Sequence, residues 1–218
     1  MIRLGLDLEK FRQAPALKGL FKKELGLDQR TRLVGIVGRL TAIKDHELFL
    51  RVVSLVKDEV PGTRFVIIGD GELRESLVKS AAALGIRDAV IFAGWRKDMA
   101  LVYADLDVVA LTSLNEGTPV SLIEAMASGC AVISTAVGGV PDLVENGKTG
   151  ILVATRQASS FKDALAALLK DEPLRRRLGE AASIQVHMRY ARTRLIRDIE
   201  ALYARLLKEK KITEAVSS

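Results

Sequence analysis

Six short apolar segments recur along the chain from residue 32 onward, and each is followed by a segment with helical spacing. The apolar segments are residues 33–37, 65–68, 90–93, 108–111, 132–134 and 151–153. Uninterrupted apolar runs are typical of strands in a parallel sheet that helices cover on both faces. The chain is therefore predicted to adopt an α/β fold, with a doubly wound, Rossmann-like parallel sheet of about six strands.

Helices are predicted between and after these strands, near residues 45–59, 72–84, 98–104, 120–128, 141–145, 160–169 and 173–187. A last helix is expected from about residue 193 to 210, with one apolar stripe formed by Leu195, Ile199, Leu202 and Leu206. We interpret residues 1–30 as a lead-in or hinge segment and 31–190 as a single Rossmann-like domain. Residues 191–218 are interpreted as a basic C-terminal helix and tail.

The composition excludes several classes of protein. A hydrophobic content of 49% over 218 residues is enough for a full core, which argues against a disordered or fibrous chain. No apolar run approaches the about 20 residues of a membrane span, and the N-terminus lacks an apolar signal core. The one cysteine, Cys130, cannot form an internal disulfide and favours a reducing compartment. We expect a cytoplasmic protein with Cys130 as a buried structural thiol.

The positive charge is concentrated near the C-terminus. Residues 172–211 hold eleven Lys or Arg and five Asp or Glu, an excess that equals the formal net charge of +6. A solvated helix face accounts for this pattern. The alternative is contact with an acidic partner or with the inner face of a membrane. Nucleic acid is not expected as a partner, because interleaved aromatic residues are few and no recognition motif is present.

Two carboxylates flank a predicted loop-to-helix junction. Glu116 lies on the loop after the fourth strand, and Glu124 lies about one turn inside the next helix. Unpaired N–H groups and the helix dipole favour a phosphate at such a helix start, here Thr118, Pro119, Val120 and Ser121. Carboxylates accept hydrogen bonds from hydroxyls. The segment is suited to a nucleotide-sugar, whereas in isolation Glu116 could be an ordinary loop acid and Glu124 a solvated one.

Two basic residues are candidates for a diphosphate clamp. Ligands bind outside the carboxyl ends of the strands in a doubly wound sheet, and Arg39 and Lys44 follow the first strand. A cation in the first turn of a helix is unfavourable unless an anion is near, so Lys44 indicates a negative ligand. The alternative is an ion pair of these residues with Asp45 or Asp70.

Two familiar phosphate-binding motifs are incomplete. The third glycine of a dinucleotide fingerprint beginning at Gly69-Asp70-Gly71 would fall at Arg74. The first glycine of a P-loop ending at Gly147-Lys148-Thr149 would fall at Asp142. Both absences weigh against nicotinamide chemistry and ATP hydrolysis. Gly69 and Gly71 are instead expected to form a tight turn that lets a ligand approach the backbone.

Histidine and metal chemistry receive little support. His46 is expected at the surface or in a helix cap, and His187 in a structural role. The two histidines and Cys130 are far apart in the sequence, so no metal site and no cofactor are expected.

Taken in order, several motifs resemble the C-terminal, donor-binding half of a family 4 retaining glycosyltransferase of the GT-B fold. The similarity covers about residues 32 to 154 closely. The motifs are Gly38-Arg39-Leu40 with Lys44, Gly69-Asp70-Gly71, Phe92-Ala93-Gly94, Glu116-Gly117-Thr118-Pro119 through Glu124-Ala125-Met126-Ala127, and Gly138-Gly139-Val140-Pro141-Asp142.

This resemblance implies a hexosyltransferase type of enzyme that uses a nucleotide diphosphate sugar as substrate. Arg39 and Lys44 would bind the diphosphate and stabilise it as leaving group, Glu116 would bind hydroxyls of the transferred sugar, and these three would be catalytic. Glu124 would bind the ribose. The remaining donor-binding positions would be Gly71, Arg96 with Trp95 beside the base, Thr118, Pro119, Val120 and Ser121.

The departures from the family limit this expectation. The 218 residues do not include a counterpart of the family's N-terminal acceptor-binding domain. The chain is therefore expected to need such a domain in cis or in trans for transfer. Residues 2–11 resemble the interdomain hinge, with Arg3 and Leu4 where Pro-Asn is usual, and Ala131 replaces a usual proline. Met1 could mark an engineered boundary, a truncated gene or one half of a split enzyme.

Two alternatives to the donor-binding half of a transferase stay open. One is a noncatalytic nucleotide-sugar-binding or scaffolding module whose basic tail recruits a partner or a membrane. A nucleotide-sugar epimerase is less favoured, because the set of Arg39, Lys44, Glu116 and Glu124 points to transfer. The nucleotide base, the sugar, the acceptor and the oligomeric state do not follow from the sequence.

Overall fold

A six-stranded parallel sheet forms the centre of the chain, for which a computed structural model describes residues 2–154 and 157–216. The strand order within this described part is β3-β2-β1-β4-β5-β6, and every neighbouring pair is parallel. The doubly wound prediction is confirmed, and the predicted strands lie within two residues of those observed. The strands are β1 Arg32–Val37, β2 Thr63–Ile68, β3 Val90–Gly94, β4 Val108–Leu111, β5 Ala131–Thr135 and β6 Ile151–Val153.

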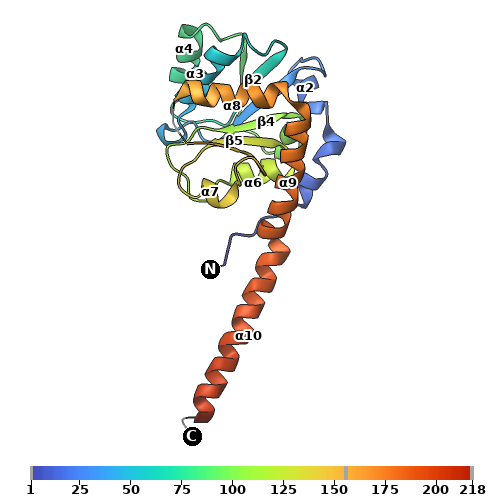
Figure 1. Cartoon of the computed structure of the whole chain (residues 1–218), viewed down its shortest axis with the longest axis vertical. Coiled ribbons are helices and arrows are strands. Elements are labelled where there is room, and N and C mark those ends of the chain that lie inside the picture. The colour runs from blue at the N-terminus through green and yellow to red at the C-terminus, as the bar shows by residue number, and fades with distance from the viewer. Residues whose placement is uncertain (1, 155–156, 217–218) are drawn as a thin grey trace.

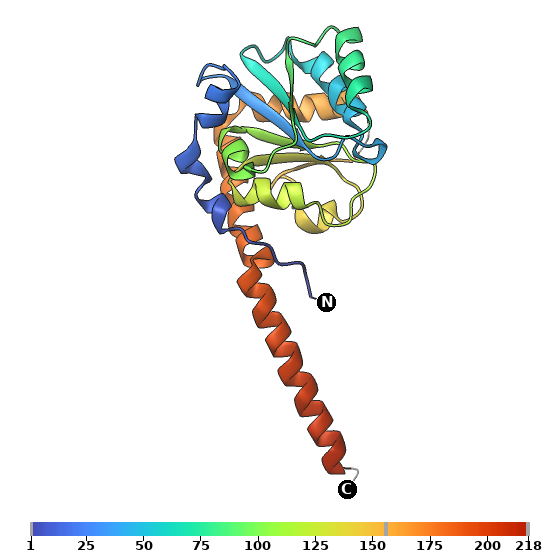
Figure 2. The ribbon, with the colours of Figure 1, turned by 180° about the vertical axis from the view of Figure 1, so that it is seen from behind.

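Helices cover both faces of the sheet, as Figures 1 and 2 show. One face packs against α3 His46–Val56, α4 Arg74–Ala83 and α8 Ala158–Lys170. The other packs against α5 Met99–Asp105, α6 Val120–Ala127, α7 Val140–Leu143 and much of α9 Glu172–Tyr190. Side chains of one strand alternate between the two cores, since Val34 and Ile36 join the first and Leu33 the second.

The lead-in segment contains short helices that the sequence analysis did not include. They are α1 Glu9–Arg12, the 3₁₀ turn η1 Ala14–Leu17 and α2 Leu20–Glu24. Each is too short to show the 3.6-residue period on which a helix assignment from sequence depends. Phe11 and Phe21 are fully buried in the core on the α5 face, so this segment packs against the sheet domain.

The last helix, α10 Arg192–Val216, projects away from the rest of the molecule (Figures 1 and 2). The N-terminal segment runs beside its start, where the Leu6 N–H donates to Tyr190 O at 2.7 Å and the Arg192 N–H donates to Leu6 O at 2.9 Å. Residue 1, at which the sequence suggested a boundary, and residues 217 and 218 of the tail lie outside the described residues. In the part of the chain that is described, no helix combines the length and apolarity needed to cross a bilayer.

The strand order changes direction between β1 and β4. From β1 the chain passes outward to β2 and β3, then returns across the sheet to pair β4 with the other side of β1. Connections diverge at such a point, which leaves a crevice at the carboxyl ends of the two strands where ligands bind in open α/β sheets. The loops after β1 and β4 are therefore the first place to look for a site.

Candidate functional site

Lys44 and Glu116 meet above this switch point. The Lys44 Nζ lies 2.6 Å from Glu116 Oε1, and the Ser113 hydroxyl donates to the same oxygen at 2.6 Å. The Glu116 side chain is only 8% exposed and that of Lys44 is 25% exposed. Both residues were predicted for one site, and the structure brings them together. Ser113 was not among the predicted site residues, because its role depends on the shape of the loop.

The turn that carries Lys44 differs from the predicted one. Lys44 ends a 3₁₀ turn, η2 Ala42–Lys44, and α3 begins only at His46. The expectation that Lys44 lies in the first turn of a helix is therefore wrong. Asp45, at φ 45°, accepts the Leu48 N–H at 3.2 Å and so caps α3. The Thr112 hydroxyl, at the end of β4, donates to Asp45 O at 2.9 Å and ties the turn to the neighbouring strand.

The loop that carries Glu116 is held by the backbone of the loop after β5. The Gly139 N–H donates to Glu116 O at 2.8 Å. A Cβ atom at Gly138 would overlap Glu116 O, and one at Gly139 would overlap Gly117 O. Only glycine permits this approach of two main chains, which fixes the backbone at Glu116.

Gly71 serves a similar approach after β2. A Cβ there would lie 2.6 Å from Leu40 O, and the Leu40 N–H donates to Asp70 O at 3.0 Å. The tight turn that the sequence predicted is present. The main chain that comes close to Gly71 is that of the loop after β1, which carries Arg39.

Glu124 lies one turn inside α6, as predicted, and is half-buried. The Tyr103 hydroxyl donates to Ser121 O at 3.1 Å and approaches Glu124 Oε2 at 3.4 Å. Burial raises the pKa of Glu124, although nearby Lys10 and the Tyr103 hydroxyl act in the opposite direction. Tyr103 and Lys10 come from distant segments, so the sequence offered no signal for either contact.

The start of α6 lies between the two acids along the chain. Pro119 is the N-cap residue and no side chain caps the helix. The first-turn N–H groups of such a helix have no acceptor within it. Pro119 is buried, Ser121 is half-buried, and Thr118 and Val120 are exposed.

Arg39 is less closely attached than Lys44. Its side chain is 77% exposed, and its Nη2 lies 3.8 Å from Glu72 Oε2. Among the described contacts, none joins Arg39 to Lys44 or Glu116. The predicted clamp is thus divided between a lysine already paired with a buried acid and an arginine at the surface.

Arg96 is fully engaged by protein carboxylates. Its guanidinium pairs with Glu24 of α2 and, at 2.6 Å, with Asp98, and it lies over the Phe21 ring. These two carboxylates raise the pKa of Arg96 above its usual value. Neighbouring Trp95 is 65% exposed. Four of the five guanidinium N–H groups donate to these carboxylates, so little capacity remains for a ligand unless a partner is exchanged.

His46 occupies a different environment from the expected surface or cap. It is 1% exposed, and neither ring nitrogen has a hydrogen-bond partner. Burial lowers its pKa to about 4, assisted by nearby Lys44 and opposed by Asp45. Cys130 is buried as expected, and burial raises its pKa to about 12. In residues 2–154 and 157–216, no three His, Cys, Asp or Glu side chains are grouped as metal ligands would be.

The family follows from comparison with known proteins. A model described as Glycosyl transferases group 1 matches residues 18–185, which is most of the chain. The chain belongs to this family. The resemblance drawn from the sequence motifs is thereby confirmed, and the match includes the loops that carry Lys44, Glu116 and Glu124.

Individual relatives are longer than this chain. It is 36% identical over 171 residues to the D-inositol 3-phosphate glycosyltransferase of Corynebacterium jeikeium, covering 74% of this chain and 41% of that protein. The chain therefore spans about two-fifths of that relative.

Solved structures agree on the fold. The Anabaena HepE structure in complex with UDP and glucose superposes with a TM-score of 0.84 at 22% identity, over 92% of this chain and 55% of that one. A C-terminal domain of the Francisella tularensis group 1 glycosyl transferase LpcC is matched over its whole length and 86% of this chain. Its TM-score is 0.74 and its identity 25%. The fold is that of one Rossmann-like half of a GT-B glycosyltransferase.

Proposed function

We propose that this chain is the donor-binding half of a retaining glycosyltransferase that uses a nucleotide diphosphate sugar. The observation that carries the proposal is the 2.6 Å contact of Lys44 with the buried Glu116 over the switch point between β1 and β4. Support comes from HepE, whose structure of the same fold contains UDP and glucose. Transfer by this chain then requires an acceptor-binding domain in cis or in trans.

Each charged group has a defined part in this proposal. Lys44 moves from Glu116 toward the diphosphate, where Arg39 joins it and both neutralise the leaving group. The released Glu116 oxygen accepts a hydroxyl of the sugar, and Ser113 keeps that carboxylate in place. Glu124 accepts the ribose hydroxyls, and N–H groups at the start of α6 bind a phosphate. Gly71 contributes to the donor site by admitting the loop that carries Arg39, and Arg96 and Trp95 border the base.

The chemical step breaks the bond between the anomeric carbon and the diphosphate oxygen and forms a bond from that carbon to an acceptor oxygen. The acceptor attacks from the face that the diphosphate leaves, so the configuration is retained. The departing diphosphate takes the acceptor proton. Lys44 and Arg39 lower the barrier because negative charge develops on the diphosphate as the bond breaks.

Exposed apolar side chains support the need for a second domain. Large apolar residues of the N-terminal segment and of α10 are 40% to 63% exposed: Ile2, Leu4, Ile196, Tyr203, Leu206 and Leu207. Such side chains on adjoining segments are typical of a surface that packs against another domain. An acceptor domain would contact both segments. To complete the donor site, α10 would have to place that domain beside the carboxyl edge of the sheet.

Calorimetric titration with UDP, GDP and ADP tests donor binding. We expect at least one to bind, and Arg39→Ala to weaken that binding by about 1.5 to 3 kcal/mol, the range for a charged hydrogen bond. Lys44→Met should weaken it similarly, while Lys57→Met, a lysine paired with Asp58 at the far end of α3, should leave it unchanged. Silence with all three nucleotides from folded protein would refute the proposal.

A noncatalytic nucleotide-sugar-binding or scaffolding module is the second candidate, favoured by the projecting basic α10. In that case the chain would act at the cytoplasmic face of a membrane or on an acidic partner. Assays of sugar transfer with and without a supplied acceptor domain separate the two. Activity restored by the added domain supports the transferase, and binding without activity in every combination supports the module.

A further inference from the structure

A hollow lies at the opposite edge of the sheet from Lys44 and Glu116. Its volume is about 760 Å³, and its wall includes Arg32 at the start of β1, Ala131 at the start of β5 and Asp107 just before β4. Lys44 and Glu116 follow the carboxyl ends of β1 and β4, so this hollow is at the amino ends of the same strands. We call it the amino-edge hollow.

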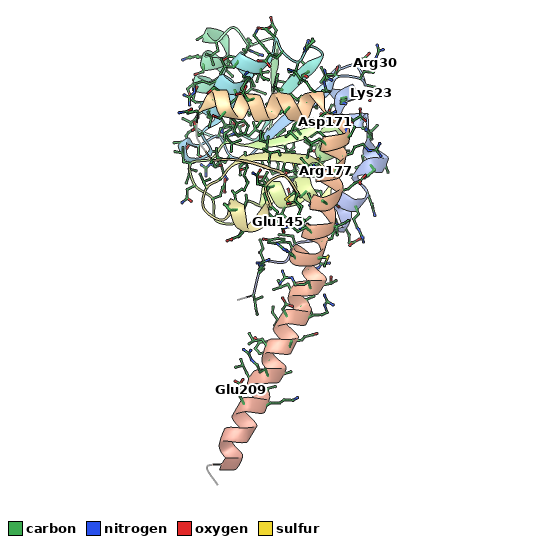
Figure 3. The ribbon with its side chains drawn as sticks, in the orientation of Figure 1. Lys23, Arg30, Glu145, Asp171, Arg177 and Glu209 are labelled. Carbon is green, nitrogen blue, oxygen red and sulfur yellow. The ribbon has the colours of Figure 1, made fainter. Side chains whose placement is uncertain are left out.

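Basic side chains dominate the wall of the amino-edge hollow. The acids there are Asp107 and Glu172. Six lining residues are Lys or Arg, from the lead-in, the start of β1 and the first turns of α9: Lys18, Lys22, Arg30, Arg32, Arg175 and Arg176. Figure 3 shows Arg30 at the same end of the body as Asp171, the residue that precedes α9. Two stretches that are distant in sequence, residues 18–32 and residues 175–176, thus contribute charge of one sign to one depression.

Lys22 is a buried cation of the hollow. Its side chain is 7% exposed, and its Nζ donates to Gln29 O at 3.3 Å and lies 3.9 Å from Asp107 Oδ2. Asp107 Oδ2 also accepts the Leu33 N–H at 2.8 Å. An ammonium group has three N–H donors, so the one described bond leaves capacity for an acceptor in the hollow. A desolvated ammonium favours an anion there more strongly than a surface lysine does.

Three further cations surround Lys22 and differ in how many protein groups hold them. Arg175 is buried, and its Nη1 donates to Leu168 O at 2.6 Å and Leu169 O at 2.8 Å, which fixes the guanidinium at the end of α8. Lys18 and Arg176 are exposed, and no carboxylate lies within ion-pair distance of either among the described residues. The hollow therefore has cations held by protein acceptors at its wall and exposed cations without a carboxylate partner among the described residues.

We propose that the amino-edge hollow binds a small ligand with two or more phosphate groups, at a site separate from the donor site. The volume lies within the range of about 300 to 1,000 Å³ typical of small-molecule sites. Arginine pairs with two phosphate oxygens at once and lysine adds a point charge, so the wall matches a diphosphate or polyphosphate. Lys22 lies below the surface, where a small ligand reaches it and a flat membrane or a duplex does not. The proposal does not depend on the function proposed above.

Pyrophosphate is the probe for this site. Calorimetry on the Arg39→Ala/Lys44→Ala chain removes the diphosphate clamp at the carboxyl edge, and we expect pyrophosphate still to bind with 1:1 stoichiometry. Adding Lys18→Ala/Arg176→Ala should weaken binding at least about tenfold, the effect of losing one charged hydrogen bond. Lys22→Met should weaken it similarly, with a thermal melt to show that the variant is folded.

The matched control is Lys23→Ala/Arg177→Ala, which removes the same charge from the neighbouring positions labelled in Figure 3. Neither residue lines the amino-edge hollow. The affinity of this control variant for pyrophosphate should therefore stay within about threefold of that of the Arg39→Ala/Lys44→Ala chain, because exposed charges are screened by salt. Loss of all pyrophosphate binding in Arg39→Ala/Lys44→Ala overturns the proposal. Equal weakening by the control pair overturns it as well, since binding would then reflect net charge alone.

Discussion

The two edges of the sheet differ in how their charges are balanced. At the carboxyl edge, Lys44 is paired with Glu116, and Arg96 with Glu24 and Asp98. At the amino edge, six basic residues line a hollow with two acids. A ligand that contacts Lys44 must displace Glu116, whereas at the amino edge Lys18 and Arg176 have no carboxylate within ion-pair distance among the described residues. Under the proposed function, the paired edge favours specificity, because a ligand supplies both a substitute anion for Lys44 and a hydroxyl for Glu116.

The edges also differ in what holds them. Backbone contacts between neighbouring loops fix the carboxyl edge, as at Gly138 and Gly139. The amino edge depends on side chains that attach the lead-in to the sheet domain, chiefly Asp105, which accepts the Gly19 N–H at 2.5 Å and the Lys22 N–H at 2.8 Å. Three substitutions, taken from the largest expected effect to the smallest, test this contrast.

Gly138→Ala should destabilise the chain by about 4 kcal/mol, because its Cβ overlaps a main-chain oxygen that cannot move without displacing Glu116. Gly147→Ala is the matched control. Gly147 also has positive φ, at 74°, but no atom lies within 4 Å of its Cβ position, so about 1 kcal/mol is expected. Urea unfolding of both variants measures the difference. Equal losses would mean that φ alone matters and that the loop contact does not hold the carboxyl edge.

His46 should make the region behind Lys44 sensitive to acid. Its pKa of about 4 in the fold lies below the ordinary value of 6.5, so the unfolded chain binds the proton more readily. Stability is therefore fully present above about pH 6.5 and falls by about 3 kcal/mol as the pH decreases to about 4. Unfolding at several pH values should show this loss in the natural chain and in His187→Gln, but not in His46→Leu. Parallel pH profiles for all three would contradict the assignment.

Asp105→Asn should loosen the wall of the amino edge. The amide keeps one acceptor oxygen, but its NH₂ group faces a backbone N–H, so a loss of about 2 kcal/mol is expected. Asp28→Asn, an exposed carboxylate that accepts the Arg30 N–H at 2.7 Å, should change stability by less than about 0.5 kcal/mol. The denaturant midpoints of the two variants measure both losses of stability. If Asp105→Asn were as mild as the control, the lead-in would be held by its apolar contacts alone.

The fold could be predicted closely because its signal is local. Each strand is an uninterrupted apolar run, and its period differs from that of the flanking helices. The lead-in helices were missed because four or five residues are too few to show a period, and the turn at Lys44 because the capping of α3 by Asp45 displaces the helix start by one residue. The family motifs identified Glu116, Glu124 and Lys44, but not their protein partners Ser113 and Tyr103.

The sequence by itself determined the parallel α/β architecture, the family and the residue types available at the carboxyl edge, because each depends on patterns within short windows. Only the tertiary structure decided which charges meet. Contacts such as Lys44 with Glu116, Arg96 with Glu24, and Lys22 with Asp107 join residues 72 or more positions apart. Such pairs form where the packing of strands and helices places them, and the free energy of a charged side chain depends on those neighbours and on its burial.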